Sequence, residues 1–149
     1  MISEKKSSIQ YLASSIKQHS KINHPLLEIN HVALHVINLA ASDNFYGEVL
    51  GLQKLPRPDF DFPGSWYGIG NQELHLIVDP GLHKANKGNH HFAILVDDVY
   101  AVKEELMQKG YTRMQEPQRR PDGAMQLFVT DPDGYLLEFC SLSHNSAVK

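Results

Sequence analysis

The chain carries the same short pattern twice, and this repeat constrains the fold more than any other feature of the sequence. Residues 31–36 read HVALHV and residues 91–96 read HFAILV, so both copies follow the order histidine, apolar, alanine, apolar, any residue, valine. A helix-ending glycine follows each pattern at nearly the same distance, Gly51 in the first copy and Gly110 in the second. A shared motif with a shared downstream register predicts an internally duplicated fold.

Each copy is followed by the same order of predicted elements. Apolar residues at helical spacing predict helices over 38–50 and 99–109. Extended segments separated by turn residues predict strands at Ile29–Ile37, Gln53–Leu55, Ser65–Ile69, Glu73–Val78, His90–Val96, Thr112–Gln115, Met125–Thr130 and Tyr135–Leu142. The sequence therefore predicts an α+β fold made of two βαβββ modules in tandem, residues 28–81 and 89–142, which form a curled, cup-shaped mixed sheet.

The segments outside the modules and the composition limit the classes of partner. Apolar residues at helical spacing predict a helical extension over 1–27, and residues 143–149 form a tail. The net charge is −3 with both signs interspersed, which argues against nucleic acid, and no apolar run has the length of a signal peptide or membrane span. The single cysteine fits a reducing compartment. We expect a cytoplasmic protein with a small-molecule partner.

Four residues of the repeat are candidate metal ligands. Side chains alternate between the faces of a strand, so His31 and His91 point away from the apolar face in their strands. By the same parity, Glu73 and Glu138 point away from the core in the last strand of each module. If the two modules pack with two-fold pseudosymmetry, these side chains converge. Imidazoles and carboxylates suit Zn²⁺, Fe²⁺, Mn²⁺, Ni²⁺ or Co²⁺, so the sequence predicts a divalent-metal site.

The sequence also resembles a known family, the vicinal oxygen chelate superfamily of glyoxalases, fosfomycin-resistance thiol transferases, extradiol dioxygenases and bleomycin-resistance proteins. The resemblance covers about residues 28–142 and rests on the strings Ile29-Asn30-His31-Val32-Ala33-Leu34-His35-Val36, Phe45-Tyr46-x-x-Val49-Leu50-Gly51-Leu52, His91-Phe92-Ala93-Ile94 and Asp131-Pro132-Asp133-Gly134-Tyr135-x-x-Glu138. It implies the same ligand set, with Glu73 the weakest member because many relatives have no ligand there. It also implies a homodimer, in which the ligands come from one chain or from two.

Further polar and aromatic residues are candidates for binding substrate. His35 shares the face of His31, and His75 shares the face of Glu73 and could replace it as a ligand. Trp66 suits a pocket wall or the core, and Arg120 suits either an anion clamp or a solvated turn. Glyoxalase-like members can carry a substrate-binding arginine at the position of His35, so its absence here changes that part of the substrate site.

The leading functional hypothesis is a glyoxalase-like metal-dependent lyase or isomerase. A substrate with two adjacent oxygens would chelate the metal, and Glu73 or Glu138 would act as general base. One alternative is an extradiol-type dioxygenase that uses His31, His91 and Glu138 to hold iron. Thiol transfer to fosfomycin would use the same three ligands. The non-enzymatic alternative is a protein of the bleomycin-resistance type that sequesters a small molecule or drug.

Overall fold

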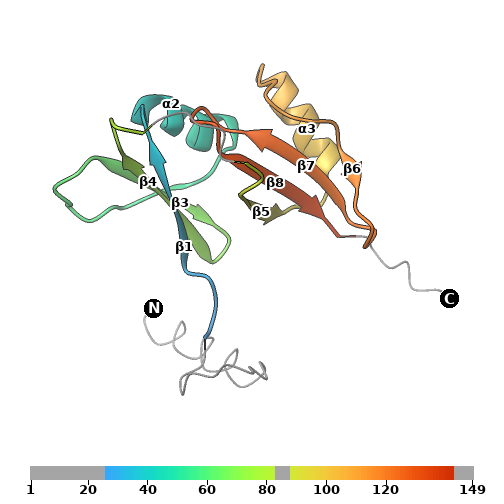
Figure 1. The fold of residues 1–149 in the computed structure, drawn as a ribbon, viewed down its shortest axis with the longest axis horizontal. Coiled ribbons are helices and arrows are strands. Elements are labelled where there is room, and N and C mark those ends of the chain that lie inside the picture. Colours follow the sequence, from blue (N-terminus) through green and yellow to red (C-terminus); the bar gives the residue numbers. More distant parts are fainter. Residues whose placement is uncertain (1–25, 83–87, 143–149) are drawn as a thin grey trace. The chain divides into compact units, whose positions relative to one another are not determined.

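The computed structural model describes residues 26–82 and 88–142 (Figure 1). The chain divides into two units, residues 1–30 and 31–149, and every helix and strand below belongs to the second unit. The predicted extension (1–27) and tail (143–149) lie outside the described residues, apart from residues 26 and 27. In the described part of the chain, no helix is both long enough and apolar enough to cross a lipid bilayer.

The first module forms a four-stranded mixed sheet with one helical segment. Its elements are β1 (His31–Val36), α2 (Leu39–Asp43), the π-helix η1 (Asn44–Val49), β2 (Lys54–Leu55), β3 (Gly64–Ile69) and β4 (Gln72–Val78). The strand order is β1-β4-β3-β2. Strand β1 runs parallel to β4, and the other neighbouring pairs are antiparallel. The parallel pair joins the first and last strands of the module.

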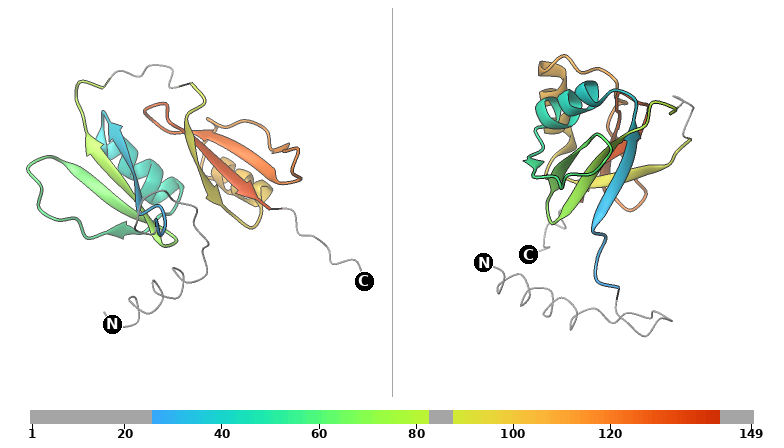
Figure 2. Two further views of the ribbon diagram at one scale, coloured as in Figure 1. Left: turned by 60° about the horizontal axis from the view of Figure 1, so that its bottom comes forward. Right: turned by 90° about the vertical axis from the view of Figure 1, so that its left-hand side faces the viewer.

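The second module repeats this topology in a second four-stranded sheet. Its elements are β5 (His91–Leu95), α3 (Val99–Gln108), β6 (Gln118–Arg119), β7 (Met125–Thr130) and β8 (Leu136–Ser141). The order β5-β8-β7-β6, with β5 parallel to β8, matches the first sheet strand for strand. Both sheets and their helices can be followed in Figures 1 and 2. The predicted α+β fold with tandem βαβββ modules is confirmed.

Two local predictions differ from the structure. The helix expected over 38–50 begins as α-helix behind its Asn38 cap and continues as π-helix, since the amide of Leu50 donates to the carbonyl of Phe45, five residues earlier. The strand expected over 112–115 is reduced to a single bridge. Met114 pairs with Val129, and the amide of Gln115 donates to the carbonyl of Phe128 at 2.9 Å, so the segment lies along β7 without forming a longer strand. The pairing strand β6 follows at Gln118–Arg119.

The strand faces follow the predicted parity. Leu34 and Val36 of β1 and Leu74 and Leu76 of β4 are buried in one hydrophobic cluster. The cluster also contains residues of the helices and of the second sheet: Phe45, Tyr46, Val99, Leu106, Leu127, Val129, Leu137 and Phe139. The opposite face of each sheet carries the histidines and glutamates of the repeat, because alternation leaves no other side for them.

A buried polar cluster joins the turn between β7 and β8 to the first module. The hydroxyl of Tyr46 donates to Asp131 Oδ2 at 2.8 Å. Asp133 accepts from the hydroxyl of Ser42 and from the amide of Ile37, both at 3.3 Å. Asp131 and Asp133 are almost completely buried. Asp131-Pro132-Asp133-Gly134, which is ordinary turn chemistry in the sequence, is therefore also a contact between the two modules.

Candidate metal centre

On the open face of the first sheet, two histidines and a glutamate lie together. His31 of β1 is paired in register with Glu73 of β4, and Ala33 is paired with His75. His75 Nε2 donates to Glu73 Oε2 at 2.8 Å. The ring of His75 stacks on the ring of His31, with 4.2 Å between centroids and 14° between planes. Strand pairing thus places these three side chains side by side.

On the open face of the second sheet, the corresponding group pairs the buried Glu138 with the partly exposed His91. Glu138 of β8 is 5% exposed, and its Oε2 lies 3.0 Å from His91 Nε2. Its other oxygen accepts from Arg120 Nη1 at 3.2 Å, and Arg120 Nη2 contacts Asp122. Burial of an unpaired carboxylate in this apolar strand would be costly, so Arg120 and His91 stabilise it.

The hydrogen bonds of His91 show that this pair fits a cation. His91 Nδ1 lies 2.7 Å from the carbonyl of Asn89, which can only accept, so Nδ1 carries the proton. In the neutral ring, Nε2 then has a lone pair that faces a carboxylate oxygen of Glu138. Two acceptors at this distance need a cation between them, either a second proton on the ring or a metal ion. A carbonyl on the distal nitrogen is also the usual support of a metal-bound histidine.

The strand register identifies the first-module counterpart of Glu138. Ala93 is paired with Glu138 in the second sheet, and the equivalent Ala33 is paired with His75 in the first. His75, not Glu73, therefore occupies the position that matches Glu138. Glu73 matches Leu136, the partner of His91. The parity of Glu73 is as predicted, but parity alone did not reveal this offset of two residues.

The four predicted ligands lie as two separate pairs. Within residues 26–82 and 88–142, no group of three or more histidine, cysteine, aspartate or glutamate side chains is close enough to hold one metal ion. His31 and Glu73 belong to the first sheet, and His91 and Glu138 belong to the second. We call His31, Glu73 and His75 the first candidate half-site and His91 and Glu138 the second. The convergence of the four side chains expected from the pseudosymmetry is not found among the described residues of one chain.

The predicted substrate-binding residues have different surroundings. Trp66 of β3 stacks on His75 with a 4.0 Å centroid separation and 5° between planes. His35 lies farther along β1, where its Nδ1 is 3.0 Å from Asp79 Oδ2, and this hydrogen bond holds the pKa of Asp79 below its ordinary value. Arg120 contacts Glu138 and Asp122. Trp66 thus lies beside the first half-site, which contains His75, and Arg120 lies beside the second.

Two residues of the second half-site were missed in the sequence. Asn89 acts through its backbone carbonyl, for which no residue type is diagnostic. Asp122 lies in a Pro-Asp-Gly turn, where aspartate needs no further explanation. The only sequence signal for a role of Asp122 was its position two residues after Arg120.

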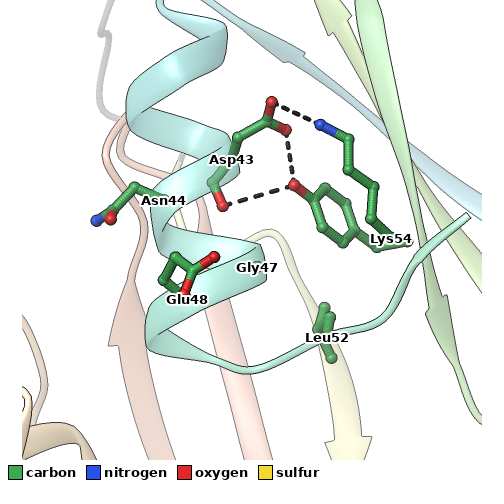
Figure 3. Close-up of a pocket in the computed structure, with 7 residues that line it drawn as sticks. Asp43, Asn44, Gly47, Glu48, Leu52 and Lys54 are labelled. Carbon is green, nitrogen blue, oxygen red and sulfur yellow. Dashed lines mark hydrogen bonds and ion pairs between the residues drawn. The ribbon is translucent and has the colours of Figure 1, made fainter.

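A separate hollow of about 410 Å³ lies on the helical side of the first module (Figure 3). Asp43 accepts from Lys54 Nζ at 2.9 Å and from the Tyr67 hydroxyl at 2.7 Å. Burial would raise the pKa of Asp43, but these hydrogen bonds bring it below its ordinary value. The same burial and the adjacent carboxylate raise the pKa of Tyr67. Asp43, Lys54 and Tyr67 thus satisfy one another, and the hollow contains none of the predicted ligands.

Known proteins match this chain over both modules. Glyoxylase I 4 of Arabidopsis thaliana is 32% identical over 130 residues, which span 78% of this chain and 71% of that protein. The lactoylglutathione lyase of Haemophilus influenzae is 32% identical, spanning 76% of this chain and 91% of that protein. A glyoxalase family protein of Enterococcus faecalis is similar in structure, with a TM-score of 0.63, 28% identity and coverage of 76% and 96%.

The match to a family model covers most of the chain. It extends over residues 28–139, which include all eight strands except the last two residues of β8. The predicted resemblance is therefore confirmed, and the chain belongs to the Glyoxalase/Bleomycin resistance protein/Dioxygenase superfamily.

Proposed function

We propose that this protein is a glyoxalase-type, divalent-metal-dependent enzyme that moves a proton next to a substrate carbonyl. The observation that carries the proposal is the pair His91 and Glu138, in which Nε2 of a partly exposed imidazole lies 3.0 Å from Oε2 of a buried carboxylate. Nitrogen and carboxylate donors of this kind suit Zn²⁺, Ni²⁺, Co²⁺, Mn²⁺ or Fe²⁺. The names of several relatives as lactoylglutathione lyases support this reaction class.

We propose further that the complete site needs two copies of the chain. His91 and Glu138 of one copy would be joined by His31 and His75 of a second copy, as a homodimer. Within the described residues, no three such side chains of one chain are close enough to hold a metal ion, which supports this arrangement. The register match between His75 and Glu138 supports His75 as the fourth ligand in place of Glu73. Both sites of a symmetric dimer would then be equivalent.

The two glutamates are assigned different roles. The side chain of Glu138 is 6% exposed and contacts both His91 and Arg120, whereas that of Glu73 is 36% exposed and bonded to His75. Glu73 is therefore the residue free to move as general base. It takes a proton from the carbon beside the carbonyl and returns it to the neighbouring carbon. A bound divalent cation would stabilise negative charge on the chelated oxygens.

The substrate class follows from the relatives and the chemistry together. A substrate with oxygens on two neighbouring carbons can chelate a metal that has open positions, and the proton on the hydroxyl-bearing carbon next to the carbonyl can then be removed. The thiol adduct of a 2-oxoaldehyde has this structure. We propose such an adduct as the substrate and the cytoplasm as the location of the enzyme.

The test is metal analysis together with turnover. The full chain, reconstituted with each of the five metals and exchanged into buffer, should retain about one ion per copy. His91→Ala should lose this ion, while His90→Ala, an exposed neighbour of opposite parity, should retain it. The loaded wild type should convert a methylglyoxal-thiol adduct. Failure of every metal to remain bound would contradict the proposal and favour a sequestering protein. Iron retention with oxygen consumption on catechols would favour a dioxygenase.

A further inference from the structure

A row of planar rings continues from the first half-site onto the loop 56–63. His31 stacks on His75 and His75 stacks on Trp66, one ring from each of three adjacent strands. Beyond Trp66 the row continues with Phe60, 6.0 Å away between centroids, and then with Phe62, 5.1 Å further. We call Trp66, Phe60 and Phe62 the aromatic wall.

The aromatic wall is held in place by contacts within the loop. The guanidinium of Arg57 lies 4.8 Å from the ring centre of Phe60 and 5.0 Å from that of Phe62. Its Nη2 donates to the Phe62 carbonyl at 2.7 Å. At the end of the loop, a Cβ on Gly64 would lie 2.2 Å from the Leu76 carbonyl oxygen, so only glycine allows this close approach. The wall is therefore built into the fold.

The wall exposes apolar surface beside polar metal-ligand candidates. Phe60 is 42% exposed and Phe62 is 38% exposed, although the two rings contact each other. Clustered exposed aromatic rings indicate a binding surface. The wall is continuous with His31 and His75, so a group attached to the chelating end of a substrate would reach it. A second copy that covered the wall would also cover these two residues.

The chemistry of the aromatic wall indicates which kind of substrate group it binds. Planar rings gain from stacked or edge-to-face contacts with aromatic rings, beyond what burial of an aliphatic group of the same size provides. The loop carries two exposed carboxylates, Asp59 and Asp61, against the single cation Arg57, and this net negative charge disfavours a negatively charged ring. We infer that the aromatic wall binds an uncharged aromatic group of the substrate, next to its chelating oxygens. The part of this inference that concerns the chelating oxygens rests on the function proposed above. The thiol adducts of aryl 2-oxoaldehydes would then be preferred as substrates over the thiol adduct of methylglyoxal.

The protein carries its own reporter for this inference, because Trp66 is the single tryptophan of the chain. Two probes share one chelating group: benzohydroxamate carries an aromatic ring, and acetohydroxamate carries a methyl group. Titration of the metal-loaded full chain, followed by Trp66 fluorescence and calorimetry, should give at least about tenfold tighter binding of benzohydroxamate.

Variants separate the wall from the metal site. The double variant Phe60→Ala/Phe62→Ala should reduce the preference for benzohydroxamate to about threefold or less, with binding of acetohydroxamate unchanged. Tyr100→Ala is the matched control, because Tyr100 is an exposed aromatic residue on α3, and it should keep the full preference. Circular dichroism and gel filtration of each variant establish that fold and assembly are retained.

The outcomes distinguish this inference from the proposed function. Equal binding of the two probes to loaded protein would overturn the aromatic inference and leave the metal site intact. A protein that retains no metal would contradict the proposed function. The same titration would then still test the aromatic wall. A preference for benzohydroxamate that the double variant removes would support the aromatic inference, and equal binding of the two probes would overturn it. A double variant that alters only the oligomeric state would identify the wall as a contact between copies and overturn the inference.

Discussion

The two modules share a topology and a strand register, but their open faces have different chemistry. In the second module, buried Glu138 is an ion pair partner of His91 and Arg120. At the matching place in the first module, His75 lies within a stack of rings and bonds to a more exposed glutamate. The core faces are alike because both must pack, whereas the open faces were free to diverge. One half-site supplies charge, and the other supplies imidazole rings and an aromatic surface.

The turns that precede the last strand of each module also differ in their chemistry. In the first module, β3 and β4 are joined by Gly70-Asn71, a two-residue turn with a positive φ at the glycine. In the second module, the longer turn from Asp131 to Tyr135 places two buried carboxylates against the first module. The duplicated unit therefore uses one of its two equivalent turns to hold the modules together.

The sharpest test of the comparison replaces each glutamate by glutamine. Glu138→Gln removes the buried negative charge, so we expect loss of bound metal and a fall in kcat/KM of about a thousandfold or more. Glu73→Gln should retain the metal and lower kcat by about a hundredfold, since only the proposed base is lost. Metal analysis and steady-state kinetics give both values. Complete metal loss in Glu73→Gln would make Glu73 a ligand and refute the assignment of His75.

The turn comparison predicts an unequal loss of stability. Asp131→Ala leaves the Tyr46 hydroxyl and the amides of Asp133 and Tyr135 without their acceptor, so we expect a loss of about 3 kcal/mol in the free energy of unfolding. Asn71→Ala, in the equivalent turn, should cost less than about 0.5 kcal/mol. Urea unfolding measures both. Similar losses in the two variants would show that the Asp131 contacts do not hold the modules together.

Arg120 should matter most when the metal is absent. Arg120→Gln removes the guanidinium that compensates buried Glu138, so the metal-free protein should unfold at a lower temperature than the metal-free wild type. Bound metal would replace that compensation, and the difference in Tm should shrink in the loaded protein. Paired thermal scans with and without chelator give the comparison. An equal decrease in both forms would assign Arg120 a purely structural role.

The smallest effect concerns His35, whose position in the second module is taken by the exposed Leu95. The hydrogen bond from His35 lowers the pKa of Asp79 in the folded protein. The contribution of this carboxylate to stability is therefore present above its ordinary pKa and is lost as the pH falls through the lowered value. His35→Ala should raise the pKa of Asp79 toward its ordinary value, as measured by carboxyl NMR titration. An unchanged pKa would mean that the His35 contact is not formed in solution.

The positions of most strands and the repeat were predictable because their signals are local. Alternation of apolar residues indicated the core faces, and the two histidine patterns established that the modules are equivalent. The strand expected at 112–115 is shortened to the bridge between Met114 and Val129, because local apolar spacing does not determine how far the pairing with β7 extends. The π-helix was missed because its hydrogen bonds skip one residue without changing the apolar spacing.

By itself, the sequence determined the duplicated α+β fold, the superfamily and the face on which His31, Glu73, His91 and Glu138 lie, because parity and repetition are properties of the chain order. Only the tertiary structure decided which residues are neighbours across strands. It matched His75 with Glu138, joined Arg120 to the buried carboxylate and divided the predicted ligands between two half-sites. The physical reason is that register depends on the pairing of distant strands, and a shift of two residues preserves every face while changing every neighbour.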